Sequence, residues 1–231
     1  MTLRPALLLT AVLVAACDSA APAPPAPTPP PVFPPAETLA AELVDPAMIR
    51  EVVDAECTPF QDAAPDAALF HIPQSEARRG ACAPLLALAD PGGQPITAEA
   101  WARASGEVTL TCVGAGTRYA FRFDGLVPGG VYTIWHFPGS GGGALATHPG
   151  GARNVFTAQT GTTTFTVVGT AGAMTMWGTV PACTLPVPPR AEVGDIGGEL
   201  FVVVYHTDNR SWGDVPGPDE TIAGHLVVMG R

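Results

Sequence analysis

Residues 118–124 read RYAFRFD, and in this segment aromatic residues alternate with charged or small ones. Tyr119, Phe121 and Phe123 occupy every second position, so they share one face of an extended chain. A period of two residues predicts a half-buried strand with an aromatic inner face and a charged outer face. This segment therefore predicts a β-sheet that is covered on one side.

Similar patterns follow along much of the chain. Glycine and proline, 26 of each, separate short apolar or alternating runs. We predict further strands at 68–72, 84–88, 108–112, 131–137, 164–167, 174–177, 200–206 and 222–229. Runs of this length joined by Gly/Pro turns are typical of a mostly β fold, a sandwich or barrel, and not of a helical bundle.

Residues 126–132 read LVPGGVY, which resembles the tyrosine corner of Greek-key sandwiches such as fibronectin type III domains. The resemblance implies that the Tyr132 hydroxyl bonds back to the backbone near the corner. It also implies that Leu126 contacts the core and that Pro128-Gly129 forms the bend. We therefore expect a Greek-key β-sandwich, although this motif indicates no function.

Short helices are expected ahead of the main strands. Asp45 and Pro46 suit the N-cap and the first position of a helix, and apolar residues follow at helical spacing to about Ala55. Thr97 is placed to cap a helix of one or two turns at 98–101. The sandwich is thus predicted to have a short N-terminal helical extension.

The start of the chain resembles the signal and lipobox of bacterial lipoproteins. Arg4 precedes an apolar run at 6–14, and Val14-Ala15-Ala16-Cys17 follows. That run is too short for a transmembrane helix, which needs roughly 20 residues. The resemblance implies cleavage before Cys17, a diacylglyceryl group on its thiol and a fatty acid such as palmitate on its amine. We expect a lipid-anchored protein of the bacterial cell envelope, outside the cytoplasm.

The sequence divides into three parts. Residues 1–16 are the predicted signal peptide, 17–36 a Pro/Ala-rich linker, and 37–231 one β-sandwich domain stapled by disulfides. Proline lacks an N–H and fixes φ, so the linker is expected to be extended polyproline II. Such a linker would act as a stalk between the membrane and the domain.

Composition narrows the function classes. The net charge is −10, and all 11 basic residues are arginine. Because the chain contains no lysine, a P-loop lysine, a Schiff base and a Ser-Lys dyad are excluded. An acidic chain without a basic cluster is also poorly suited to nucleic acid, so we expect no nucleic-acid partner.

Apart from Cys17, the chain has four cysteines, an even number that predicts disulfides in an exported protein. Four cysteines allow three connectivities. We predict Cys112 with Cys183, because Cys112 shares an inward face with Val108 and Leu110, and the bridge would join two sheets. The remaining pair is then Cys57 with Cys82.

The candidate chemical site is a group of histidines. His206 and His225 flank a polar loop between two predicted strands, and His136 follows the inward alternation of Tyr132. Converging imidazoles would bind Zn²⁺ or Cu²⁺, with Asp208 as a further ligand. The alternative is three separate structural histidines, and the lack of closely spaced histidine pairs favours it. On that interpretation the protein has no cofactor.

Other residues indicate no chemistry. Ser140 lies in GSGGG, which lacks the spacing of a nucleophile elbow. Residues 207–220 form an acidic loop that would suit Ca²⁺ but has no EF-hand spacing, so we interpret it as solvated. Trp135 and Phe137 alternate with the inward residues of their strand, and are either exposed for binding or covered by another element.

These observations favour a non-enzymatic function. The leading hypothesis is a lipid-anchored binding or structural module of the cell envelope, whose ligand the sequence does not identify. Its partners would be the membrane, through the lipid, and an envelope or extracellular molecule that contacts loops 138–154 and 207–220. The alternative hypothesis is a metal-binding β-sandwich that uses His136, His206 and His225.

Overall fold

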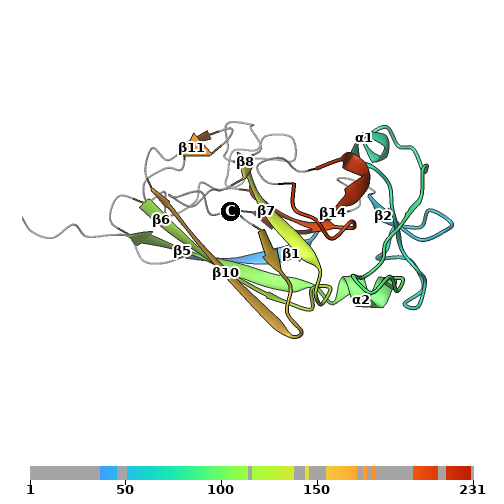
Figure 1. Ribbon diagram of the computed structural model, residues 1–231, viewed down its shortest axis with the longest axis horizontal. Coiled ribbons are helices and arrows are strands. Elements are labelled where there is room, and N and C mark those ends of the chain that lie inside the picture. Colours follow the sequence, from blue (N-terminus) through green and yellow to red (C-terminus); the bar gives the residue numbers. More distant parts are fainter. Residues whose placement is uncertain are drawn as a thin grey trace, which may run out of the picture. The chain divides into compact units, whose positions relative to one another are not determined.

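The computed structural model describes residues 37–45, 51–113, 116–137, 144–145, 155–170, 174–175, 178–179, 200–212 and 217–229. All of them belong to one compact unit, which spans Phe33–Arg231. Within this unit most elements are antiparallel strands (Figure 1), so the predicted mostly β fold is confirmed.

The largest sheet is antiparallel throughout and contains nine of the described strands. They are β1 (Glu37–Leu43), β5 (Ser105–Val113), β6 (Gly116–Asp124), β7 (Val131–Phe137), β8 (Ala144–Leu145), β9 (Val155–Thr157), β10 (Thr162–Thr170), β13 (Leu200–His206) and β14 (Ile222–Met229). The order is β10-β6-β5-β1-β14-β13-β7-β8, and β9 also pairs with β7.

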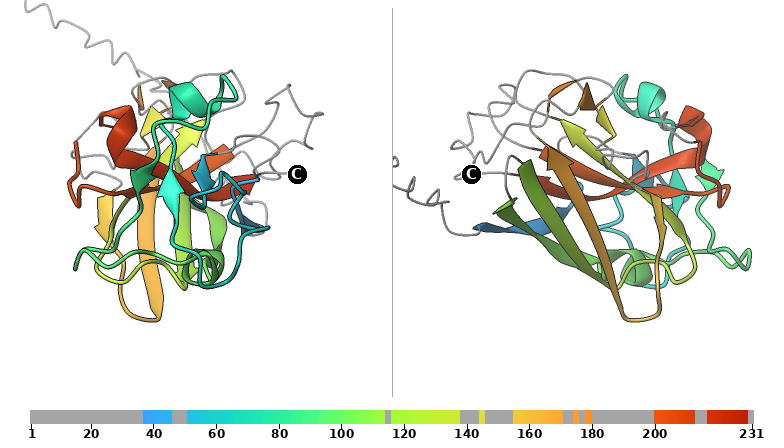
Figure 2. Two further views of the ribbon diagram at one scale, coloured as in Figure 1. Left: turned by 90° about the vertical axis from the view of Figure 1, so that its right-hand side faces the viewer. Right: turned by 60° about the vertical axis from the view of Figure 1, so that its left-hand side comes forward.

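The path of the chain through this sheet includes a long-range crossing. β6 and β7 are consecutive in sequence, but β5, β1, β14 and β13 lie between them in the sheet. The segment with the tyrosine-corner motif makes this crossing, as the Greek-key resemblance implies. The sheet curls over one core (Figure 2), because Phe156 of β9 stacks on Phe123 of β6 at 5.6 Å and on Phe165 of β10 at 5.4 Å.

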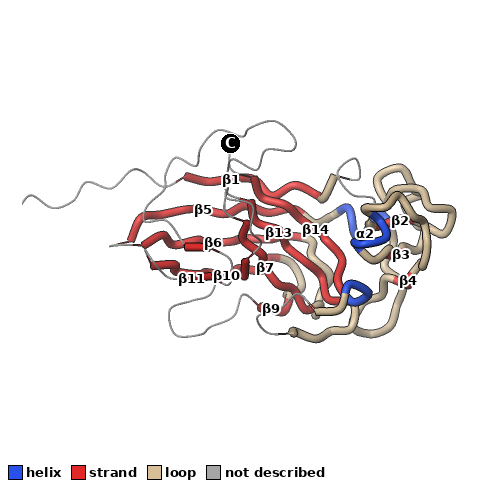
Figure 3. The backbone as a smooth tube through the Cα atoms, turned by 90° about the horizontal axis from the view of Figure 1, so that it is seen from above, coloured by secondary structure: helices blue, strands red, loops and turns tan. Residues whose placement is uncertain are grey.

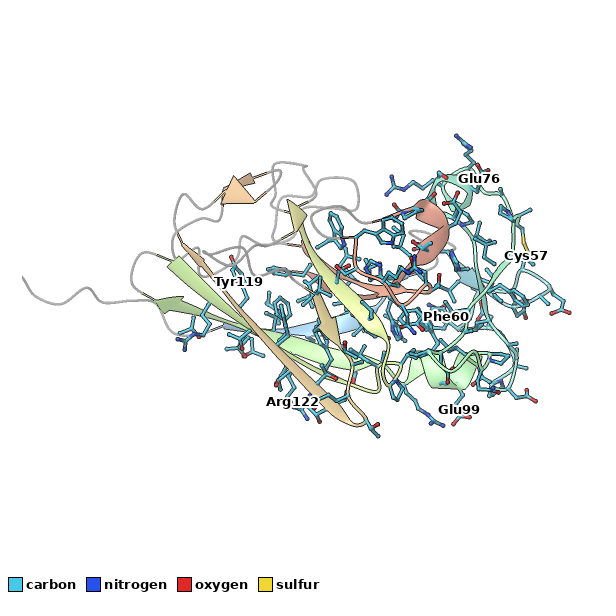
Figure 4. The ribbon with its side chains drawn as sticks, in the orientation of Figure 1. Cys57, Phe60, Glu76, Glu99, Tyr119 and Arg122 are labelled. Atoms are coloured by element: carbon cyan, nitrogen blue, oxygen red, sulfur yellow. A yellow bond between two sulfur atoms is a disulfide. The ribbon has the colours of Figure 1, made fainter. Side chains whose placement is uncertain are left out.

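The predicted two-residue period is confirmed in β6. Tyr119, Phe121 and Phe123 are buried in the core, whereas Arg118 and Arg122 are exposed. β5 pairs with β6 over its whole length, from Ser105 opposite Asp124 to Val113 opposite Gly116. The aromatic face of β6 therefore forms one wall of the main core. Figure 4 shows Tyr119 of this face on the opposite side of the view from Cys57 and Glu76.

A smaller three-stranded sheet and two short helices precede β5. We call residues 51–102 the N-terminal segment; it contains β2 (Val52–Val53), β3 (Phe70–His71), α1 (Gln74–Ala77), β4 (Leu86–Ala87) and α2 (Ala98–Ala102). These elements lie together at one end of the long strands (Figure 3). The expected helix at 98–101 is confirmed, and the Thr97 hydroxyl accepts the Ala100 N–H at 3.3 Å.

The prediction of a helix from Asp45 to about Ala55 is wrong at its C-terminal end. Val52 and Val53 form β2 and pair with His71 and Phe70 of β3, while residues 46–50 lie outside the described part of the chain. Both valines are buried, and β-branched side chains favour a strand that can pack in this way. Strands expected at 68–72 and 84–88 are present as the shorter β3 and β4.

Two further elements differ from the expectations. β1 was not predicted, because its sequence ETLAAEL has high helix propensity, yet it pairs with both β5 and β14. Of the strand expected at 174–177, the structure describes β11 (Met174–Thr175), which pairs with β12 (Gly178–Thr179). A short 3₁₀ helix, η1 (Asp219–Thr221), leads into β14.

The structure confirms the predicted disulfide between Cys57 and Cys82, whose Cα atoms are 6.2 Å apart. The Cys112 side chain and the whole of Cys183 lie outside the described residues, as do the predicted signal peptide, Cys17 and the predicted linker. In the parts of the chain that the structure describes, no helix is long and apolar enough to cross a membrane.

Candidate functional site

His206 and His225, two members of the predicted histidine site, are fully buried but lie on opposite faces of the main sheet. His206 Nε2 is 2.8 Å from the Thr133 hydroxyl, and His225 Nδ1 is 3.1 Å from the Tyr132 hydroxyl. Tyr132 and Thr133 are neighbours in β7, so their side chains point to opposite faces. The two imidazoles therefore do not converge.

His225 is a hydrogen-bonded part of the core. Its Nε2 lies 2.9 Å from the Trp101 carbonyl, and its ring stacks on the Trp101 indole at 3.5 Å. Because a carbonyl only accepts, Nε2 carries the proton and Nδ1 accepts from the Tyr132 hydroxyl. The same hydroxyl accepts the Val127 N–H at 3.0 Å, which confirms the back-bond expected of a tyrosine corner. Burial lowers the pKa of His225 to about 4.

His206 belongs to a separate polar contact on the other face. The Thr133 hydroxyl accepts the indole N–H of Trp135 at 3.1 Å and bonds His206. Trp135 is buried and packs with Val204. Of the two alternatives for this side chain, burial is therefore correct and exposure for binding is wrong. Burial lowers the pKa of His206, and the Asp208 charge opposes this shift.

Of the two remaining members of the predicted site, Asp208 acts on His206 through its charge, and no described contact brings either one to His225. The backbone of His136 pairs with Phe201, and its side chain lies outside the described residues. Asp208 accepts the Trp212 indole N–H at 3.0 Å and the Arg210 N–H at 3.1 Å. Within the described residues, no group of three or more His, Cys, Asp or Glu is arranged to hold a metal ion.

The structure instead gathers other titratable groups near the start of β14. Glu51 precedes β2, His71 belongs to β3 and Asp219 begins η1. Glu51 is only 4 % exposed, and its carboxylate accepts the Gly224 N–H. Burial raises the pKa of Glu51 to about 7; the Asp219 charge adds to this effect, whereas the Gly224 hydrogen bond and Arg78 oppose it.

The pKa of Asp219 is shifted in the opposite direction from that of Glu51. It accepts the N–H groups of Gln74 and Ser75, both at 2.9 Å, and the Ser75 hydroxyl at 2.6 Å. Burial disfavours its ionised form, but these hydrogen bonds and the Arg78 charge outweigh burial and hold the pKa of Asp219 below its usual value. Asp219 therefore has a structural role. We expected residues 207–220 to form a solvated loop, and at Asp219 this expectation is wrong.

His71 completes this cluster. It is 1 % exposed, and backbone groups of Glu220 and Leu86 act on its imidazole ring. Burial lowers the pKa of His71, while the backbone at Glu220 and the charges of Asp219 and Glu220 oppose the shift. We name Glu51, His71 and Asp219 the acid cluster: it holds one carboxyl group that titrates near neutral pH and one whose pKa is below its usual value.

Sequence reasoning did not find the acid cluster, since Asp219 is 144 positions from Ser75, a residue that it contacts. No local signal marked Glu51, because charged residues often stand next to apolar ones in sequence and its burial depends on the fold. The fold and these sites define an antiparallel β protein with hydrogen-bonded polar groups in its interior. The chain matches no protein-family model, no curated protein and no solved structure.

Proposed function

We propose that this protein is a lipid-anchored module of the bacterial cell envelope with a binding or structural role. The observation that carries the proposal is the order of the first 17 residues: an arginine, a short apolar run, two alanines and Cys17. The Pro/Ala-rich linker that follows would hold the β unit away from the lipid.

Two structural features support this proposal. The Cys57–Cys82 disulfide suits an oxidising compartment outside the cytoplasm, where such bonds persist. The buried polar side chains Tyr132, Thr133, His206 and His225 make internal hydrogen bonds that join strands, which is a structural use. Both features favour a stable module over a catalyst.

A candidate contact residue for a partner lies between β13 and η1. Trp212 is 42 % exposed, and tryptophan is enriched at protein interfaces. Its indole N–H donates to Asp208, and its ring lies against Gly217, where a larger residue would collide with it. The indole is therefore held in place at the surface, which favours a binding role for this loop.

The test of the anchor is the substitution Cys17→Ala. We expect the variant to lose incorporation of radiolabelled palmitate and to move from the membrane pellet to the soluble fraction. The reason is that stable anchoring requires at least two hydrocarbon chains, at about 0.8 kcal/mol per buried CH₂. The Cys57→Ala/Cys82→Ala double variant is the control and should stay in the pellet. A Cys17→Ala protein that remained in the pellet with its label would refute the proposal.

A further inference from the structure

The N-terminal segment is tied to the far end of the chain by polar contacts. The Asp219 carboxylate in η1 receives two backbone N–H groups and one hydroxyl from Gln74 and Ser75, at the start of α1. These partners are 144 and 145 positions away in sequence. Asp219 thus holds the beginning of α1 against η1.

Glu51 makes a second connection between the same parts. Its carbonyl accepts the Ile72 N–H at 2.8 Å, so its backbone belongs to the small sheet. Its carboxylate, however, lies on β14, where a Cβ added to Gly224 would be 3.0 Å from Glu51 Oε2. Glycine at 224 therefore leaves the space that the carboxylate occupies.

The charged and titratable groups that act on Glu51 come from several elements. Asp219 lies on η1, and Arg78 directly follows α1. His71 on β3 interacts electrostatically with Asp219 and Glu220, which both lie on η1. β14 supplies the backbone N–H of Gly224. An ionised Glu51 would be a buried anion near the partly exposed Asp219 carboxylate, with one exposed arginine to offset it.

We propose that Glu51 and Asp219 form a proton-controlled latch, which holds the Glu51 side chain against β14 and the start of α1 against η1, and loosens when Glu51 loses its proton. The latch is a property of the β unit alone and is independent of the lipid anchor. No covalent change is involved, because the step is the loss of one proton from the Glu51 carboxyl group to water.

The direction of the pH effect follows from the pKa values. The pKa of Glu51 is about 7 in the fold and 4.5 when solvated, so the closed latch binds a proton that the open form releases. The stabilisation by Glu51 is complete below about pH 4.5 and is lost as the pH rises to 7. Asp219 and His71 act in the opposite direction: their lowered pKa values remove stability as the pH falls below 3.8 and 6.5 respectively.

The experiment is amide hydrogen exchange on the full chain between pH 6 and pH 8, read at the Ile72 N–H and corrected for intrinsic exchange. Comparing the wild type with Glu51→Gln cancels the effects of Asp219 and His71, which both proteins share. We expect the opening constant of the wild type to rise about tenfold relative to Glu51→Gln across this range. Glu56→Gln, which changes an exposed carboxylate in the same segment, should behave as the wild type.

An equal pH dependence in the wild type and in Glu51→Gln would overturn the latch. If Glu51→Gln fails to fold, Asp219→Asn provides a second test, because removing the Asp219 charge lowers the pKa of Glu51. In that variant the rise in opening should level off at lower pH than in the wild type, so its midpoint moves down. An unchanged midpoint would contradict the proposal, whether or not Cys17 is lipidated.

Discussion

The Tyr132 hydroxyl connects three parts of the chain. It accepts the Val127 N–H within the corner and donates to Nδ1 of His225 in β14. The other ring nitrogen of His225 donates to the carbonyl of Trp101 in α2. His225 must be neutral to accept this bond. Because burial lowers its pKa to about 4, its contribution to stability is present above pH 6.5 and is lost as the pH falls through 4.

The Tyr132→Phe substitution tests this connection. The phenylalanine ring would still fill the core, but the buried Val127 N–H and His225 Nδ1 would lose their partner. We expect the free energy of unfolding to fall by about 2 kcal/mol or more, measured by urea denaturation. Thr38→Ala, which removes an exposed bond to Thr109, should change it by less than about 0.5 kcal/mol. Equal effects of the two substitutions would contradict this role for Tyr132.

At the scale of the elements, the pairing of β5 with β6 depends on close approach of their backbones. Gly106 lies opposite Phe123, whose ring is buried in the main core. A Cβ at Gly106 would be 2.5 Å from Phe123 Cδ1 and 2.6 Å from the Arg122 carbonyl oxygen. The absence of a side chain at this position therefore allows Phe123 to occupy its place.

We expect Gly106→Ala to destabilise the fold by about 1–3 kcal/mol, because the Arg122 carbonyl is backbone and cannot turn away as a side chain would. Thermal or urea unfolding measures the loss. Gly92→Ala is the matched substitution: its added Cβ would meet mainly the flexible Asp90 side chain in a turn. If Gly106→Ala were no more destabilising than Gly92→Ala, the close approach of β5 and β6 would not limit residue size.

At the scale of the whole molecule, the β unit has two stabilising systems. The main sheet encloses a large aromatic core, which also takes in apolar side chains of the N-terminal segment such as Leu69, Leu88 and Trp101. A second, small core in that segment is made of Val53, Ile72 and Ala77 with Leu85 beside them, and because it buries little apolar area the nearby disulfide adds to its stability. The Cys57–Cys82 bond closes a loop with a separation of 25 residues.

Replacing both cysteines, as Cys57→Ala/Cys82→Ala, should cost roughly 3 kcal/mol through the greater entropy of the open chain. The loss should concentrate in the N-terminal segment, so amide exchange and limited proteolysis of residues 51–102 are the measurements. Cys17→Ala keeps this disulfide and should match the wild type. Unchanged protection of the segment in the double variant would show that packing alone holds it.

Several features of this protein were predictable from the sequence because they depend on local chemistry. The alternation in β6, the Thr97 cap and the hydroxyl bond of Tyr132 each involve residues within a few positions of one another. The pairing of Cys57 with Cys82 is also confirmed, across a short loop. Strand period, helix capping and corner geometry operate over such distances, so one short segment contains the whole signal.

The tertiary structure alone decided the remaining features. β1 has the residues of a helix, but neighbours on both sides supply its backbone hydrogen bonds. The pairing of β13 with β14 shifts its register between Val203 and Val204, so simple alternation does not give the face of His225. Glu51 and Asp219 interact only because Glu51 lies against Gly224 of β14 and η1 leads directly into that strand. Contacts between residues more than 100 positions apart depend on strand order, which no local pattern encodes.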